Sequence, residues 1–333
     1  MTIRIKAILS LAAVGIAAAA LALGWGYREA VRPGPLAEPQ RVIVEKGAGL
    51  GTIAGMLQQK GAVERELLFK LTAWAMGAGR ALRAGEFEIP ARASLVEVIE
   101  TLRSGELIER RLTVPEGLSS LQILALLRRT EGLEGDIEAP PREGSLLPET
   151  YSFHYGDSRA ALLERMAAAQ DRALAELWPG RAGGLPFISA YEAVTLASIV
   201  EKETALAEER PLVASVFINR LDRGMRLQSD PTVIYGLTEG APLGRALTRA
   251  DLESDTPYNT YRYSGLPPTP IAHPGRASIA AVLNPAETDY LYFVADGSGG
   301  HAFAETLTEH NRNVRQWRRR SASERDGAGK DPE

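Results

Sequence analysis

The residues best placed to do chemistry are the carboxylates Glu201 and Glu203, which end an apolar stretch. Residues 191–204 read YEAVTLASIVEKET, and no charge occurs from Ala193 to Val200. The stretch is too apolar all round for a surface helix and is typical of a buried one. A carboxyl group at the end of such a helix loses hydration, which disfavours its charged form. Glu201, the first carboxylate after the run, is therefore a candidate general acid for protonating a glycosidic oxygen.

Helical geometry separates the two acids. At about 100° per residue, Glu203 lies roughly 200° around the helix from Glu201, so the two should not face one substrate bond together. Glu201 instead shares its face with the small residues Ala197 and Ser198. A helix ending in solvated Glu-Lys-Glu is the simpler interpretation of this stretch alone, and the rest of the chain has to decide between the two.

Composition excludes several other chemistries. The 333 residues are 45% hydrophobic and 24% charged, as in an ordinary globular protein. A net charge of -4 and the lack of a basic, aromatic-interleaved stripe argue against nucleic-acid binding. There is no cysteine, no Gly-x-Ser-x-Gly elbow, no phosphate-binding loop and no histidine pair at metal-binding spacing. We expect no cofactor, and carboxylate chemistry on a polymer or a purely structural role remains.

The amino-terminal segment predicts a membrane anchor. Residues 7–27 carry no charge, which is close to the roughly 20 residues that a spanning helix needs. A cleaved signal peptide is the competing interpretation, because Ala20-Leu21-Ala22 resembles a cleavage site, but the uncharged run exceeds the usual apolar region of about 7–15 residues. We therefore expect a cytoplasmic tail over residues 1–6, a transmembrane helix over 7–27 and a proline-rich linker over 28–40.

The pattern after the linker predicts an α+β protein. A strand from Val42, helices near 53–57 and 64–76, a strand at 87–89 and a helix capped by Ser94 form one small unit over residues 41–110. A larger mixed α+β domain follows over 111–317. It contains a helix around 160–178, the apolar helix that ends at Glu201, and a pair of strands at 290–295 and 301–303. We expect the tail, residues 318–333, to be disordered.

Two polar stretches in the larger domain suit a sugar-binding groove. Residues 226–236 and 257–261 are rich in Tyr, Asn, Gln and Pro, which makes them poor core material. Such side chains bind sugars by stacking and hydrogen bonding, although ordered loops of this composition are about as common. We expect Tyr235, Asn259 and Tyr261 to line a glycan groove.

Several motifs of this domain closely resemble the YceG-like family of endolytic murein transglycosylases. They are ASIVEKET at 197–204, VFINRL at 216–221, LQSDPTVIYG at 227–236, YNTY at 258–261, GLPP at 265–268 and YFVADG at 292–297. The resemblance extends from the membrane segment to about Trp317.

The resemblance implies a single-pass enzyme of the bacterial inner membrane, with a LysM-like subdomain at 41–110 and its catalytic domain in the periplasm. It implies that nascent peptidoglycan strands are cut internally between N-acetylmuramic acid and N-acetylglucosamine. The products would be 1,6-anhydro-muramyl ends, strand elongation would stop, and peptidoglycan synthases would be candidate partners.

The resemblance also assigns residues. The family's catalytic glutamate maps onto Glu201. Substrate binding is assigned within the matching motifs to Glu149, Gln228, Asp230, Thr232, Tyr235, Asn259 and Tyr261. Glu149 stands where the family often has Asp. His273 stands where Asn or Thr is usual, so it receives no catalytic role.

Two other classes of function remain open. One is a hydrolytic muramidase, which would need a second carboxylate about 5–9.5 Å from Glu201, with Asp230 as the obvious candidate. An Asp-Pro pair in a loop is, however, more often a turn than a catalytic base. The other is a non-catalytic, membrane-tethered protein that binds peptidoglycan. A lyase-type transglycosylase needs only one carboxyl group, because the sugar's own 6-hydroxyl replaces water.

Overall fold

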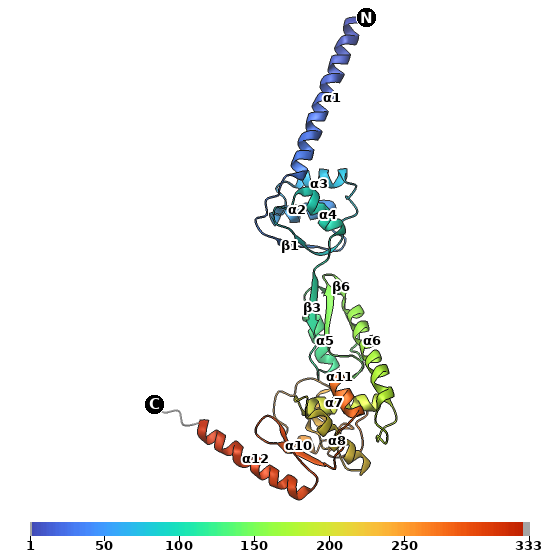
Figure 1. The fold of residues 1–333 in the computed structure, drawn as a ribbon, viewed down its shortest axis with the longest axis vertical. Coiled ribbons are helices and arrows are strands. Elements are labelled where there is room, and N and C mark those ends of the chain that lie inside the picture. Colours follow the sequence, from blue (N-terminus) through green and yellow to red (C-terminus); the bar gives the residue numbers. More distant parts are fainter. Residues whose placement is uncertain (1, 329–333) are drawn as a thin grey trace, which may run out of the picture. The chain divides into compact units, whose positions relative to one another are not determined.

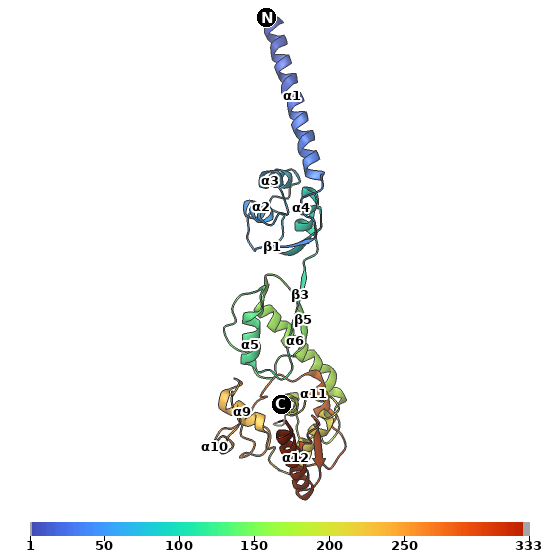
Figure 2. The ribbon, with the colours of Figure 1, turned by 90° about the vertical axis from the view of Figure 1, so that its left-hand side faces the viewer.

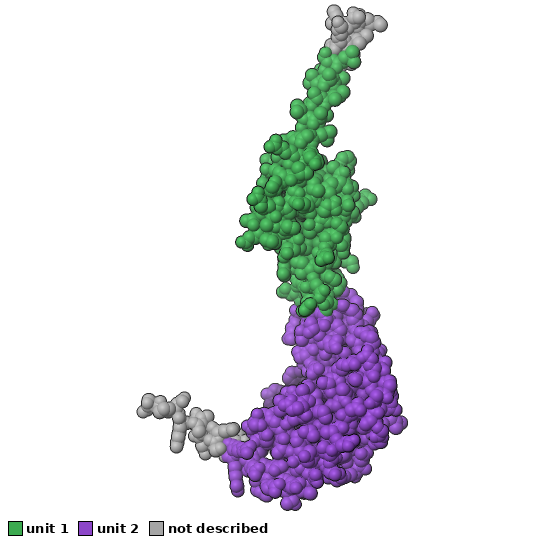
Figure 3. Space-filling model, in the orientation of Figure 1, with its two compact units in different colours: residues 1–111, 131–134, 152–157 green, residues 112–130, 135–151, 158–333 purple. Residues whose placement is uncertain are grey.

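The chain forms two compact units that both mix helices with short strands. The structure, a computed structural model, describes residues 2–328. Unit 1 comprises residues 1–111, 131–134 and 152–157, and unit 2 comprises the remainder (Figures 1 and 3). The first crossing between the units follows Arg111, and two short later segments also belong to unit 1. The α+β fold class is confirmed.

Helix α1 (Thr2–Val31) contains the candidate membrane span. Within it, Leu9–Val31 is long and apolar enough to cross a bilayer, with a mean hydropathy of 1.9 over its best window. A signal sequence satisfies the same test. The helix was expected to end at Tyr27, but it continues to Val31, because Arg28 and Glu29 are good helix formers and no proline occurs before Pro33.

The expected linker over residues 28–40 is not a free spacer. The N–H of Gly34 donates to the carbonyl of Arg92 at 3.0 Å, and the N–H of Arg92 donates to the carbonyl of Leu36 at 2.9 Å. The Leu36 side chain packs against the core of unit 1. This segment therefore belongs to the folded unit that follows it.

Unit 1 has the predicted order of strand, helix, helix, strand and helix. Its elements are β1 (Gln40–Val44), α2 (Leu50–Gln59), α3 (Glu66–Ala75), β2 (Gly85–Ile89) and α4 (Leu95–Ser104). β1 pairs antiparallel with β2, with Val42 opposite Phe87, and the three helices lie on one side of this ribbon (Figures 1 and 2). Ser94 caps α4 through a capping box with Glu97, as predicted.

The segment from residue 109 to 180, which crosses between the two units, contains short strands and two helices. The elements are β3 (Glu109–Thr113), α5 (Ser120–Arg129), β4 (Leu133–Glu134), β5 (Thr150–His154), β6 (Asp157–Ser158), α6 (Arg159–Leu177) and the 3₁₀ turn η1 (Trp178–Gly180). β3 pairs with β5, and β4 pairs with β6. The long helix α6 matches the helix predicted near 160–178.

A helical core in unit 2 holds the predicted catalytic helix. Its elements are α7 (Ala190–Glu203), α8 (Arg210–Asp222), α9 (Asp230–Thr238), α10 (Arg249–Leu252) and α11 (Arg276–Leu283). α7 packs against α8 and α11 through fully buried side chains that include Leu196, Ile199 and Phe217. The antiparallel pair β7 (Tyr292–Ala295) and β8 (His301–Ala304) closes the unit, as the sequence predicted.

Helix α12 (Leu307–Ala328) corrects the expectation for the tail. Residues 318–333 were expected to be disordered, but the helix runs through Ala328. The residues of this segment are good helix formers up to Gly327, and no proline precedes Pro332. The last five residues of the expected tail lie outside the described residues.

Candidate active site

Helix α7 positions Glu201 at the end of a buried segment. The helix begins with a capping box between Ser189 and Glu192, and every residue from Ala193 to Val200 is buried. Helices pack on both sides of it, so its apolar composition is explained by burial. The Glu201 side chain is 6% exposed. The helix end is therefore not solvated, which favours the interpretation of Glu201 as a functional carboxyl group.

Glu201 is held by one backbone donor and one cation. Its Oε2 accepts a hydrogen bond from the N–H of Gly275 at 2.8 Å, and its Oε1 lies 3.6 Å from Nη2 of Arg210. Gly275 immediately precedes α11 and Arg210 opens α8. Three helices thus fix the position of one carboxyl group.

A second carboxyl group, that of Glu116, faces the first. Its Oε2 lies 3.4 Å from the same Nη2 of Arg210, and its side chain is 41% exposed. Burial raises the pKa of Glu116, the charge of Glu201 and a hydrogen bond to it raise that pKa further, and Arg210 opposes the shift. Two carboxyl groups this close favour holding one proton between them.

Gly275 makes room for this pair. A Cβ atom added at Gly275 would lie 1.8 Å from Oε1 of Glu116. Any side chain at this position would push the Glu116 carboxyl away while the backbone N–H still held Glu201. Glu116 was not predicted as a site residue. The only sequence signal for Glu116 is the Val-Pro-Glu-Gly turn before an amphipathic helix.

A pocket of about 300 Å³ is lined by chain neighbours of the carboxyl pair, but not by Glu116 or Glu201 themselves. Gly117 and Lys202, the residues that follow Glu116 and Glu201, both line it. Lys202 Nζ donates to the carbonyl of Gly117 at 3.2 Å. The other lining residues are Ser119, Gln122, Pro231, Ile234, Tyr235, Thr238, Gly240, Ala241, Pro242 and Ile271.

Tyr235 is the predicted groove residue that lies in this pocket. Its ring packs against Tyr258 with centroids 4.8 Å apart and ring planes tilted by 58°. Burial raises the pKa of Tyr235, with the neighbouring charge of Glu143 as a second cause. An aromatic ring with a neutral hydroxyl beside an open pocket can both stack on a sugar and hydrogen-bond to it.

Asp230 and Tyr261 contact each other but do not line the pocket. The Tyr261 hydroxyl donates to Oδ1 of Asp230 at 2.6 Å. Burial and this neighbouring carboxylate raise the pKa of Tyr261. Asp230 also raises the pKa of Glu203, the other acid of α7. Gln228 and Glu149 are exposed and do not line the pocket either.

The predictions of Asn259 as a groove-lining residue and of Thr232 as a substrate-binding residue need correction. Both residues are fully buried, at 0% exposure. The Thr232 hydroxyl donates to the carbonyl of Ser229, and the Asn259 amide donates to the carbonyls of Leu252 and Ser254. Oδ1 of Asn259 accepts the N–H of Tyr261. These side chains hold the polar loops in place and present no atom to a ligand.

Glu203 points away from Glu201, as the helical geometry predicted, but not into solvent. The Ser229 hydroxyl donates to its Oε1 at 2.5 Å. Burial raises the pKa of Glu203, and Asp230 raises it further. Glu203 therefore fastens the 226–236 loop to α7.

A buried network lies behind the Tyr235 side of the pocket. The N–H of Ser120 donates to Oε1 of Glu143 at 2.9 Å. The ring of His273 is fully buried, with Nε2 2.9 Å from the Ser120 hydroxyl and 3.6 Å from Oε2 of Glu143. Burial lowers the pKa of His273 to about 4 and raises that of Glu143 to about 7. His273 thus has a structural role.

Glu143→Gln should flatten the pH dependence of stability between pH 6.5 and 8. The pKa of Glu143 is raised from 4.5 to about 7, so its protonated form stabilises the fold. That contribution is full below pH 4.5 and is lost as pH rises through about 7. The wild-type protein should lose about 1 kcal/mol more than the variant over this interval. Urea unfolding at both pH values measures this difference, and equal losses would contradict the assignment.

The described residues offer no metal site, since no group of three His, Cys, Asp or Glu side chains converges among them. The side chains of this site that can take part in chemistry are the Glu116–Glu201 pair, Arg210 and the hydroxyls of the pocket. A proton donor or acceptor beside a polar pocket is the arrangement that the sequence predicted for attack on a glycosidic bond.

The chain is similar to known proteins over most of its length. It is 31% identical over 300 residues to an endolytic murein transglycosylase of Bacillus subtilis, covering 81% of this chain and 82% of the relative. It is 30% identical to an endolytic murein transglycosylase of Streptococcus pneumoniae, covering 81% of this chain but 57% of that longer relative.

The fold has a counterpart in a solved structure. The crystal structure of a putative yceG-like protein from Listeria monocytogenes superimposes with a TM-score of 0.53 at 29% identity. The match covers 83% of this chain and 98% of that one. The family description for YceG-like proteins matches residues 42–316, which cover parts of both units and the whole site. This chain belongs to the YceG-like family.

Proposed function

We propose that this chain is an endolytic lytic transglycosylase that cleaves peptidoglycan glycan strands, with Glu201 as its acid and base. The observation that carries the proposal is the Glu116–Glu201 pair on Arg210, whose next residues in the chain, Gly117 and Lys202, line the pocket. Glu201 is nearly buried, burial raises the pKa of Glu116, and Tyr235 gives the pocket an aromatic wall. The names of the two bacterial relatives point to the same reaction.

The reaction needs one carboxyl group in two steps. Protonated Glu201 gives its proton to the glycosidic oxygen that leaves N-acetylmuramic acid. The carboxylate then takes the proton of that sugar's own 6-hydroxyl, which attacks the anomeric carbon and closes a 1,6-anhydro ring. The proton balance closes, because the one that leaves Glu201 is replaced by the one from the hydroxyl. Water takes no part.

In the proposed reaction, Glu116 assists Glu201 as a neighbouring carboxyl group. Its carboxyl group holds a proton within reach of Glu201, and Arg210 orients both groups. Glu116 Oε2 and Glu201 Oε1 lie 3.4 and 3.6 Å from the same Nη2 of Arg210. A lyase is preferred to a hydrolytic muramidase because the bacterial relatives are named endolytic murein transglycosylases.

The alternative muramidase with Asp230 has less support. Asp230 accepts the Tyr261 hydroxyl and neighbours Glu203, on the face of α7 turned away from Glu201. A non-catalytic binding protein would not need a carboxyl pair at the end of a buried helix. Asp230 and Tyr261 remain candidates for substrate contacts beyond the pocket, as do Gln228 and Glu149.

The proposal also covers the location of the protein and the identity of its first subdomain. Helix α1 would anchor the chain in the inner membrane, with both units in the periplasm, where peptidoglycan synthases make the strands. The strand–helix–helix–strand order of unit 1 supports a LysM-like subdomain. Cleavage within nascent strands would end their elongation.

Digestion of long glycan strands tests the proposed function. An endolytic enzyme should first produce fragments of intermediate length, and disaccharides should appear late. Chromatography of the products at early times distinguishes these outcomes. Release of disaccharides from the start, without intermediate lengths, would contradict internal cleavage.

A further inference from the structure

Helix α3 carries an exposed apolar surface that the proposed reaction does not use. Leu67, Leu71 and Trp74 are 63%, 55% and 78% exposed. Their spacing of four and three residues puts them on one face of the helix. The opposite face buries Phe69 and Ala73 in the core of unit 1. Single exposed apolar residues are ordinary, but three on one helix face indicate a binding surface. We call these three residues the α3 stripe.

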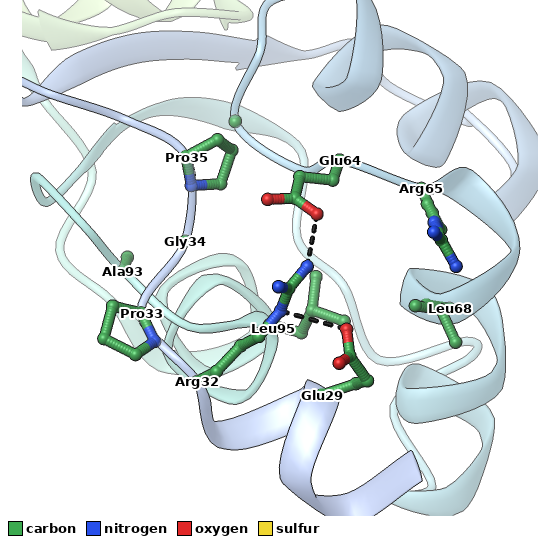
Figure 4. Close-up of a pocket in the computed structure, with 11 residues that line it drawn as sticks. Glu29, Arg32, Pro33, Gly34, Pro35, Glu64, Arg65, Leu68, Ala93 and Leu95 are labelled. Carbon is green, nitrogen blue, oxygen red and sulfur yellow. Dashed lines mark hydrogen bonds and ion pairs between the residues drawn. The ribbon is translucent and has the colours of Figure 1, made fainter. Parts of the chain in front are cut away.

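The α3 stripe lies beside the end of the candidate membrane span. Figure 4 shows Arg32, just beyond α1, reaching both Glu29 of α1 and Glu64, which precedes α3. Residues from the end of α1 and from α3, including Arg65 and Leu68, line one small pocket there. The end of α1 is thereby fixed against the start of α3.

The two views of the fold agree on where helix α3 lies within unit 1. α3 lies on the side of unit 1 from which α1 emerges, whereas β1 lies on the opposite side (Figures 1 and 2). If α1 spans a bilayer up to Val31, α3 is at the level of the lipid headgroups. Trp25 and Tyr27 are exposed near the same end of α1, and aromatic residues are enriched at membrane interfaces.

The charges around the α3 stripe indicate whether it would prefer anionic lipids. Arg28 and Arg65 are exposed, but Glu64 pairs with Arg32 and Glu66 pairs with Lys70 at 2.7 Å. The surroundings are thus mixed in sign, and an attraction to anionic lipids would be weak. Burial of apolar side chains among acyl chains would supply the binding free energy.

We propose that the α3 stripe is embedded in the interface of the bilayer that α1 spans. The proposal rests on the membrane anchor of the proposed function. It gives unit 1 a second attachment to the membrane besides α1, which fixes its orientation on the bilayer surface. A phosphatidylcholine bilayer should suffice as the partner.

Single-cysteine labelling tests the proposal in the full chain, which contains no native cysteine. Ala75 is exposed at the end of α3, so Ala75→Cys leaves the stripe intact. The labelled chain is placed in phosphatidylcholine nanodiscs, and lipids that carry a spin label quench a nearby fluorophore. The control is Glu88→Cys, exposed on β2. The reference for the anchor is Val14→Cys in α1.

The proposal expects strong quenching at position 75, little at position 88 and strong quenching at position 14. Adding Leu71→Ser and Trp74→Ser to the Ala75→Cys chain should remove most of the quenching at 75. With these two substitutions in the Val14→Cys chain, quenching at 14 should persist.

Three results would overturn the proposal. Quenching at 14 but not at 75 leaves the anchor intact and rejects the membrane-bound stripe. No quenching at 14, or a mature chain cleaved near Ala22 that lacks this position, rejects the anchor and the inference with it. A probe at 75 that responds to added glycan strands and not to lipid would identify the stripe as a sugar-binding surface.

Discussion

Glu201→Gln should abolish strand cleavage while leaving the protein folded. Gln has nearly the same shape as Glu, and its Oε1 can still accept the N–H of Gly275 that now binds the carboxylate. It can neither give nor take a proton at the glycosidic oxygen. A general acid–base contribution is about 10²–10⁴-fold, and the loss should be greater because one group serves both steps. Digestion of glycan strands, with circular dichroism to confirm folding, measures the effect.

Glu203→Gln is the matched control on the same helix. The raised pKa of Glu203 shows that its buried site favours the neutral form, which Gln imitates, and the amide oxygen can still accept the Ser229 hydroxyl. This variant should therefore remain folded and lose far less activity. If Glu203→Gln were the inactive variant, or if Glu201→Gln kept substantial activity, the assignment of the acid and base would be wrong.

Glu116→Gln should make activity fall at high pH and recover at low pH. The carboxyl group of Glu116 helps the pair hold a proton, and its removal lowers the pair's affinity for that proton. A neighbouring charge typically moves such a titration by about one unit or more, so cleavage above pH 7 should drop by about tenfold. Near pH 5 the variant should approach the wild-type rate, because the supply of protons then limits the reaction less.

The pH profile separates this role from a merely structural one. If Glu116 only supported the fold, the substitution would lower the rate by the same factor at every pH and lower the melting temperature. Rates of both proteins from pH 5 to 8, with thermal unfolding at each pH, distinguish the two. A uniform loss would contradict the shared proton.

Glu201 could be predicted as a site residue from the sequence, but Glu116 could not. The apolar run of residues 193–200 predicted a buried helix, and the first carboxylate after it is the one that Arg210 and the N–H of Gly275 hold. Glu116 reaches the same point from a turn 85 residues earlier in the chain, since both contact Arg210. No local pattern predicts such a long-range contact between side chains.

Polar composition misplaced Asn259, and the family resemblance misplaced Thr232. The 226–236 and 257–261 stretches looked like groove loops, and Tyr235 does line the pocket. Thr232 and Asn259 carry the same kind of side chain but use every bond to hold those loops together. Periodicity distinguishes buried from exposed positions in helices and strands, yet irregular loops have no period, so their inward and outward residues look alike in a sequence.

The ends of helices were also poorly predicted from the sequence. The sequence placed the end of the first helix at the last uncharged residue, Tyr27, whereas α1 continues to Val31 and the segment after it packs onto unit 1. A charged residue ends an apolar run but does not end a helix, because Arg and Glu both favour helical backbone. The α3 stripe was not predicted either, since the sequence indicated a helix near 64–76 but not that Leu67, Leu71 and Trp74 are exposed on it.

The mass of the new strand ends tests directly whether the 6-hydroxyl of the sugar or water attacks the anomeric carbon. Glycan strands digested by the wild-type protein in ¹⁸O-labelled water should end in 1,6-anhydro-muramic acid. Each product should be lighter by one water than a hydrolysed end and free of ¹⁸O, because the 6-hydroxyl of the sugar is the nucleophile. Reducing ends that contain ¹⁸O would show that water attacks the anomeric carbon. They would contradict the assignment of this chain as a lytic transglycosylase.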